Sequence, residues 1–138
     1  MVPDFVPLYA VVTVLFSLIY FALASFAFVF VRLDVPEVGR LFRGLFNVYF
    51  WMVAVTGLMA TAAFAASGRF AYMAGMFLLA VSALSMRRWT LDHIDAQRDA
   101  ARAGDRAAVR RLRTMHWGGM LANIAVVATV LTSVRHIL

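Results

Sequence analysis

The chain has 138 residues, of which 64% are hydrophobic and only 14% are charged, and its formal net charge is +6. Soluble domains contain roughly 45–50% apolar and about 25% charged residues, so this composition excludes an ordinary soluble fold. It predicts a single integral membrane domain over residues 1–138. The chain contains no cysteine, which excludes disulfides, thiolate metal sites and a cysteine nucleophile.

Four long apolar runs predict four membrane-spanning helices, at residues 5–31, 45–66, 70–86 and 115–134. Each run has, or nearly has, the roughly 17–25 residues that a spanning helix needs. The first run lacks a basic leading segment and is too long for a signal peptide, so we expect it to be a span of the mature protein. The sequence therefore predicts an all-α fold, a four-transmembrane-helix bundle.

The polar stretch 87–113 predicts a helical extension outside the membrane, between the third and fourth spans. Its segment TLDHIDAQRDAARAG is rich in alanine and places Asp95 three residues before Arg98, a spacing that favours helical ion pairs. We expect Gly104 to end this helix and Asp105 to cap the next one.

Arginines are concentrated on one side of this topology. The connections 32–44 and 87–113 share that side and hold eleven arginines, whereas the other side has only Arg69 and Arg135. Basic residues are enriched in cytoplasmic loops, so we expect both connections in the cytoplasm and both termini on the outer side. All 13 basic residues are arginines, a usage typical of GC-rich bacterial genomes, which favours the bacterial inner membrane.

Three of these arginines, Arg110, Arg111 and Arg113, precede the fourth span, and we expect them to contact lipid headgroups. The stretch 87–113 also contains four aspartates and has a net charge of only +4, which argues against nucleic-acid binding. The expected partners are the lipid bilayer and either other membrane subunits or further copies of this chain.

Polar residues inside the spans mark a candidate site in the cytoplasmic half. His116 and Asn123 fall on one face of the fourth span together with Gly119. The second span enters the membrane from the same side, so Asn47 and Tyr49 are expected at a similar depth. These four polar side chains are the predicted ligand-binding residues.

Two interpretations of this polar group remain open. In one, the side chains only form hydrogen bonds between helices, and small residues on the fourth span allow a neighbouring helix to approach closely. The candidate packing residues are Gly118, Gly119 and Ala122. In the other, the polar group lines a small pocket that is open to the cytoplasm.

Cofactor chemistry is not expected. A haem site with two axial histidines needs both inside the bundle, and only His116 approaches the bundle interior. The sequence lacks clustered ligands for zinc. Eight methionines could ligate a soft metal such as Cu(I), although packing explains them more simply. We therefore predict no catalytic residues, no bound metal and no cofactor.

Three segments carry a resemblance to a known family. They are FVFVRL at the end of the first span, LFRGLFNVYF at the start of the second, and IDAQRDAARAGDRAAVRRLRTMHWGGMLAN before and within the fourth. Over residues 26–130 the chain resembles the transmembrane protein 205-like family of four-helix membrane proteins. The family's histidine and asparagine match His116 and Asn123. The chain departs from the family at Met115, Gly119 and Asn47, where leucine, serine and proline are usual.

The resemblance implies a four-helix fold and gives only a weak indication of function, the handling of soft metal compounds. From the residues themselves, the first functional prediction is a non-enzymatic accessory or scaffold subunit of a membrane assembly, or a homo-oligomer. The alternative is a protein that binds or transports a small molecule or soft metal through a pocket in the cytoplasmic half. An oxygenase or haem enzyme is the third interpretation.

Overall fold

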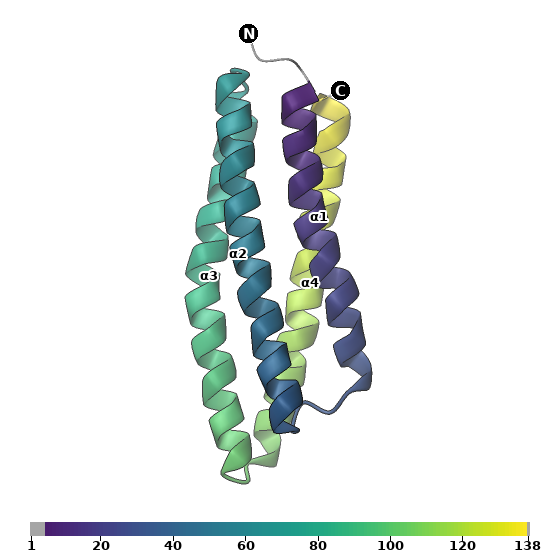
Figure 1. Cartoon of the computed structure of the whole chain (residues 1–138), viewed down its shortest axis with the longest axis vertical. Helices are drawn as coiled ribbons and strands as arrows, with labels where there is room; N and C mark the ends of the chain where they lie inside the picture. Colours follow the sequence, from purple (N-terminus) through teal and green to yellow (C-terminus); the bar gives the residue numbers. More distant parts are fainter. Residues whose placement is uncertain (1–4, 138) are drawn as a thin grey trace.

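The computed structural model describes residues 5–137 and consists of four long helices (Figure 1). They are α1 (Phe5–Ala27), which continues into a 3-10 turn η1 (Phe28–Phe30), α2 (Pro36–Ala66), α3 (Phe70–Arg102) and α4 (Arg106–Ile137). No β-strand occurs within residues 5–137. All four helices are long and apolar enough to cross a membrane, so the predicted all-α, four-span architecture is confirmed at this level.

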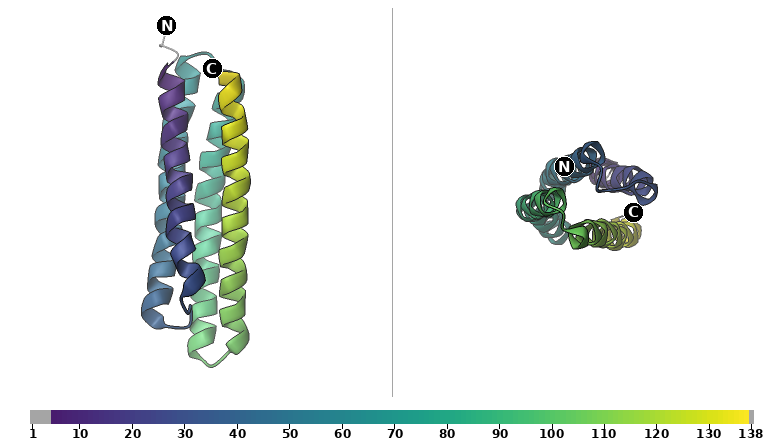
Figure 2. Two further views of the ribbon diagram at one scale, coloured as in Figure 1. Left: turned by 90° about the vertical axis from the view of Figure 1, so that its right-hand side faces the viewer. Right: turned by 90° about the horizontal axis from the view of Figure 1, so that it is seen from below.

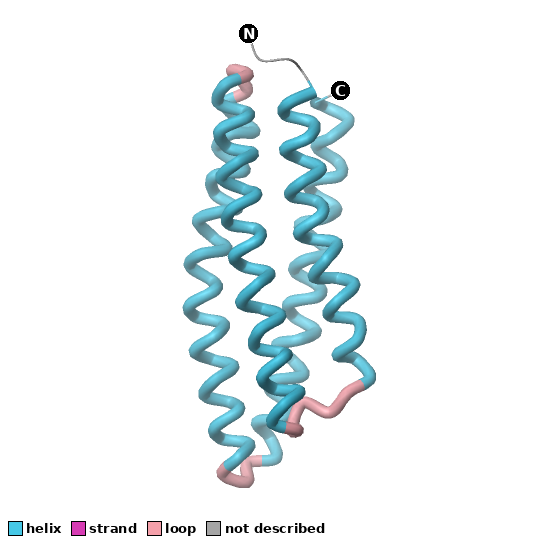
Figure 3. The backbone as a smooth tube through the Cα atoms, viewed as in Figure 1, coloured by secondary structure: helices cyan, strands magenta, loops and turns pink. Residues whose placement is uncertain are grey.

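The helices run alternately up and down around a ring in chain order, and α4 closes the ring by packing against α1 (Figure 2). The 31–35 connection and the 103–105 turn lie at one end of the bundle (Figure 3). We call it the basic end, because the segments that meet there hold eleven of the 13 arginines. Phe5, Ile137 and the 67–69 turn lie at the opposite end.

Local sequence explains where the helices begin and end. Gly68 and Gly104 adopt positive φ angles of 72° and 97°, which glycine tolerates best, and each closes the helix before it. Asp105 then caps α4, since its carboxylate accepts a hydrogen bond from the backbone N–H of Ala107 at 2.9 Å. Pro36 opens α2, where its missing N–H and fixed φ are favourable. The predicted roles of Gly104 and Asp105 are confirmed.

Three helices, α2, α3 and α4, extend well beyond the apolar runs that predicted them. α2 begins at Pro36 within the expected loop 32–44, and α3 continues without a break to Arg102. Hydropathy detects only the segment suited to lipid, whereas a helix continues until a residue ends it. The polar stretch is therefore a continuation of α3 and α4 around a tight turn, and its side of the membrane stays a prediction.

The extended parts of α2 and α3 are joined by an ion pair. Arg43 Nε donates to Asp95 Oδ1 at 2.7 Å, and Arg98 approaches the same carboxylate at 3.9 Å. Deeper in the bundle the same two helices pack tightly at Gly57, where an added Cβ would lie 3.1 Å from Ala80 Cβ. α2 and α3 thus form one closely packed half of the bundle.

The outward surface carries many large apolar side chains. Phe16, Leu23, Leu78 and Leu121 each expose between 63% and 72% of their area. A soluble monomer rarely exposes contiguous apolar surface on this scale, whereas lipid tails solvate it at no cost. The structure therefore describes a multi-pass membrane protein.

Candidate functional site

A buried contact joins α4 to α1 near the basic end. His116 of α4 and Ser25 of α1 are both fully buried. Nε2 of His116 lies 2.7 Å from the hydroxyl oxygen of Ser25 and 2.9 Å from its carbonyl oxygen. The rings of Phe28 and Phe42 flank the imidazole edge to face, with centroids 6.4 and 5.6 Å away. The histidine is therefore held between helices and does not extend towards water.

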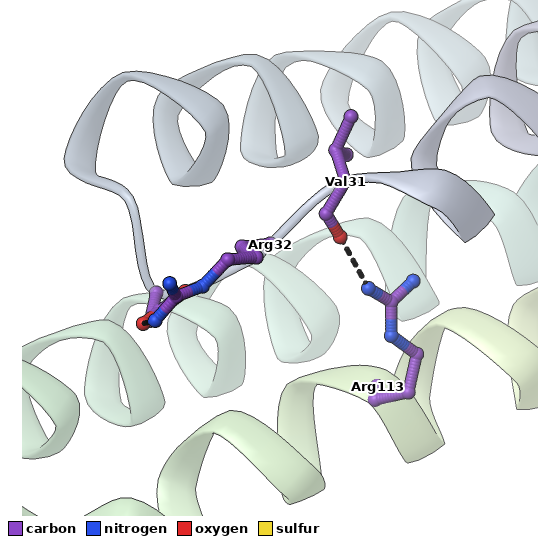
Figure 4. Close-up of polar contacts among 4 residues, drawn as sticks. Val31, Arg32 and Arg113 are labelled. Atoms are coloured by element: carbon purple, nitrogen blue, oxygen red, sulfur yellow. Dashed lines mark hydrogen bonds and ion pairs between the residues drawn. The ribbon is translucent and has the colours of Figure 1, made fainter.

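Arg113, one turn before His116, binds the segment that directly follows α1. Its guanidinium donates to the carbonyl oxygens of Phe28 and Val31, both at 2.6 Å. Figure 4 shows this side chain reaching from α4 to the backbone at Val31. The last carbonyl groups of a helix have no partner within the helix, and a cation there is also stabilised by the negative end of the helix dipole. Arg113 thus supplies the cap that the sequence after Ala27 lacks.

The arginine also determines which nitrogen of His116 carries the proton. Arg113 lies 3.3 Å from Nδ1 of His116, and a guanidinium can only donate hydrogen bonds. We therefore assign Nδ1 as the acceptor and place the ring proton on Nε2, which donates to Ser25. Both ring nitrogens are engaged, so neither is free to bind a metal or a haem iron in this conformation.

Asn123 makes the second contact between the same two helices. Its side-chain nitrogen donates to the carbonyl oxygen of Leu18 at 3.0 Å, and the residue is 1% exposed. Leu18 and Ser25 are seven residues apart on α1, as His116 and Asn123 are on α4, so the two contacts repeat along the antiparallel pair. We call these contacts, together with those of Arg113, the α1–α4 ladder.

One hydrogen-bond acceptor of this ladder has no partner within the described residues. The side-chain oxygen of Asn123 is buried and has no hydrogen-bond partner within the described residues. Asn123 does not line the α3–α4 cavity described below. A buried acceptor without a partner costs free energy, and the hydrogen bond from the amide nitrogen to Leu18 offsets part of that cost.

The other two predicted ligand-binding residues lie away from the ladder. Asn47 accepts a hydrogen bond from Arg87 Nε at 2.9 Å, and this contact joins α2 to α3. Tyr49 packs its ring against Phe21, with centroids 4.1 Å apart. The structure therefore brings His116 and Asn123 together on one helix pair, but it does not gather all four residues around one pocket.

The predicted headgroup arginines differ in their surroundings. Arg111 donates to the carboxylate of Asp105 at 2.7 Å and to Gln97. The hydrogen bond from Arg111 holds the pKa of the Asp105 carboxyl below its usual value. Arg110 is exposed, and Arg113 binds α1 as described above. Contact of these side chains with lipid phosphates stays a prediction.

The small residues of α4 do not all pack against a neighbouring helix. A Cβ added at Gly119 would lie 2.9 Å from Cε1 of Phe46, so this position is tightly packed against an aromatic ring. A Cβ added at Gly118 would meet nothing within 4 Å, and Ala122 is exposed. Of these three residues, Gly119 alone is therefore packed closely against another helix of this chain.

An apolar cavity of about 400 Å³ lies beside these residues, between α3 and α4. We call it the α3–α4 cavity. Aromatic side chains of α2 form its floor, among them Phe46, Tyr49 and Phe50. Its rim contains the exposed residues Met86 and Ala122, so it opens sideways between the two helices. Of the four predicted ligand-binding residues, Tyr49 alone lines it.

Within residues 5–137 no group of three or more histidine and acidic side chains is arranged to hold a metal ion. Comparisons with protein-family models, curated proteins and solved structures find no match for this chain. The resemblance to the transmembrane protein 205-like family therefore stays a prediction based on short motifs.

Proposed function

We propose that this chain is a non-enzymatic membrane protein that acts through packing, as an accessory or scaffold subunit of a membrane assembly or as a homo-oligomer. The supporting observation is the α1–α4 ladder. The strongest polar groups within the spans, His116 and Asn123, are buried and bind the backbone of α1. Side chains used in this way hold helices together and are not available to a substrate.

The proposal includes an orientation and a location. The eleven arginines at the basic end favour a cytoplasmic basic end, with the opposite end and the termini on the periplasmic side of a bacterial inner membrane. The exposed apolar side chains of α4, Leu121, Ile124 and Leu131, offer a contact surface for another membrane helix.

Native mass spectrometry of the gently solubilised protein tests this function, because it reports copy number and partner subunits together. We expect each chain to be released as part of a homo-oligomer or of a complex with another membrane protein. A chain that stays monomeric and partner-free in every mild detergent would contradict the scaffold proposal.

The second candidate function is the binding of a small apolar molecule or a soft metal, and the α3–α4 cavity supports it. The thioethers of Met86 and Met115 line this cavity, and thioethers are suitable ligands for Cu(I). Equilibrium dialysis against Cu(I), with quantification of the retained metal, tests this candidate. Retention that is lost when both methionines are changed to leucine would favour it over the scaffold proposal.

A further inference from the structure

The α3–α4 cavity has the shape and position of a site for one lipid tail. We propose that it holds one acyl chain of an anionic phospholipid from the membrane leaflet at the basic end. This inference goes beyond the scaffold function, since a scaffold can form with or without a bound lipid.

The length of the cavity matches one leaflet. It runs from Leu79 to Thr90 along α3 and from Met115 to Val126 along α4. At 1.5 Å per residue both walls are about 16 Å long. The hydrocarbon core of a bilayer is roughly 30 Å thick, so the cavity extends over about half of it. A neighbouring cavity of about 610 Å³ shares Leu79, Ser82 and Val126 with it and continues towards the opposite end of the bundle.

The volume and lining of the cavity suit a hydrocarbon chain. The cavity has a volume of about 400 Å³, and its walls are almost entirely aliphatic or aromatic, as burial of a lipid tail requires. A helix of a second copy of this chain, at least about 10 Å wide with its side chains, could cover the opening.

The cavity also ends where a lipid headgroup would lie. Trp89 and Met115 line its basic end, and tryptophan is enriched at membrane–water interfaces. Arg110 and Arg111 follow about one turn further out on α4. Arg111 continues the face of α4 that lines the cavity, and its guanidinium is bound to Asp105. Arg110 is exposed, forms no ion pair within residues 5–137 and lies about 100° further round the helix.

The net positive charge of the basic end favours a lipid with a negatively charged headgroup. Its eleven arginines outnumber its six acidic residues, which are Asp34, Glu37, Asp92, Asp95, Asp99 and Asp105. Basic residues beside the cytoplasmic ends of membrane helices attract anionic lipids. The occupant is therefore a phospholipid with a net negative headgroup, anchored by one tail in the cavity.

The test measures binding of palmitoyl-oleoyl phosphatidylglycerol to the delipidated full-length protein in detergent, by native mass spectrometry. We expect one tightly retained lipid per chain. Ala122→Leu places a side chain in the opening and should weaken retention by about tenfold. The matched control is Ala128→Leu, another exposed alanine of α4, which lines neither the α3–α4 cavity nor its neighbour, and it should bind like the wild type.

Further comparisons keep the proposal testable. Gly118→Leu replaces Ala122→Leu if the latter fails to fold, because a Cβ at Gly118 has open space around it. Phosphatidylcholine with the same chains should be retained less well than phosphatidylglycerol, and equal retention would overturn the anionic headgroup. Absence of bound lipid in the wild type, or full retention in both cavity variants, would overturn the site. Copy number appears in the same spectra, so a failure of the scaffold proposal is seen separately.

Discussion

The hydroxyl of Ser25 and Nε2 of His116 lie 2.7 Å apart in the fully buried contact between α1 and α4. The contact fixes the register of the two antiparallel helices, because Leu18 and Asn123 then meet two turns deeper. In lipid the hydrophobic effect does not drive helices together, so packing and such polar contacts must select the register.

Truncating the histidine should cost more stability than truncating the serine. His116→Ala removes a fully buried ring together with its contacts to α1, at a cost of about 2–4 kcal/mol. Ser25→Ala leaves the carbonyl acceptor in place and should cost about 0.5–1 kcal/mol. Unfolding in mixed micelles, run as a double-mutant cycle, measures both values. Equal costs would mean that the imidazole contributes little beyond its bond to the hydroxyl.

Loss of the arginine cap should loosen the segment after α1 locally. Arg113→Met keeps much of the side-chain volume but removes two bonds to the carbonyls of Phe28 and Val31. We expect faster hydrogen exchange at residues 28–35 and a loss of about 1–3 kcal/mol in stability. Arg113→Lys keeps the charge but not the fork geometry, so its effect should be intermediate. Unchanged exchange in Arg113→Met would show that the connection is held by other contacts.

The orientation can be tested because the chain has no cysteine of its own. Ala96 is exposed on the basic-end part of α3, and Ala66 is exposed at the opposite end of α2. In spheroplasts we expect an impermeant maleimide to label Ala66→Cys directly and Ala96→Cys only after lysis. The reverse pattern would place the basic end outside.

Purified protein should show no Soret absorption band. Both ring nitrogens of His116 are occupied by Ser25 and Arg113, so haem ligation would require the α1–α4 ladder to break. An absorption spectrum of protein from cells supplied with haem tests this expectation. A stoichiometric haem signal that disappears in His116→Ala would make electron transfer the leading functional hypothesis.

Much of the architecture follows from local sequence. Apolar runs locate the four helices, and Gly104 with Asp105 locates the turn between the last two. These features depend on residues close together in the chain, so a single sequence contains them. The early start of α2 at Pro36 is also a local signal, but hydropathy alone does not register it.

The partners of the polar side chains were harder to predict. The acceptors of His116, Asn123 and Arg113 are largely backbone carbonyls of α1 and of the segment after it, and every residue has a carbonyl, so no residue type marks them. The expected depth in the membrane placed Asn47 near His116. Depth does not show which way a side chain faces around its helix, and Asn47 faces Arg87 of α3. The seven-residue spacing shared by Leu18–Ser25 and His116–Asn123 was the one available signal for the pairing.

The two adjacent glycines of α4 provide the sharpest test of the packing. At Gly119 an added Cβ would lie 2.9 Å from the Phe46 ring, whereas at Gly118 it would meet no atom within 4 Å. Gly119→Leu should therefore force Phe46 out of the core and cost typically about 1–3 kcal/mol, while Gly118→Leu should be tolerated. The same substitution on neighbouring residues controls for helix propensity and for added apolar volume.

Asn123→Ala completes this comparison, because it removes one hydrogen bond to α1 without adding volume. Its cost should be about 0.6–1.7 kcal/mol, generally less than that of Gly119→Leu. Thermal unfolding in detergent, with oligomer size recorded alongside, ranks all three variants. If Gly119→Leu proves as stable as Gly118→Leu, the Phe46 ring moves freely and the packing on this face of α4 is loose. If Asn123→Ala keeps full stability but loses a bound ligand, the small-molecule function replaces the scaffold function, because the asparagine then serves the ligand and not the helix pair.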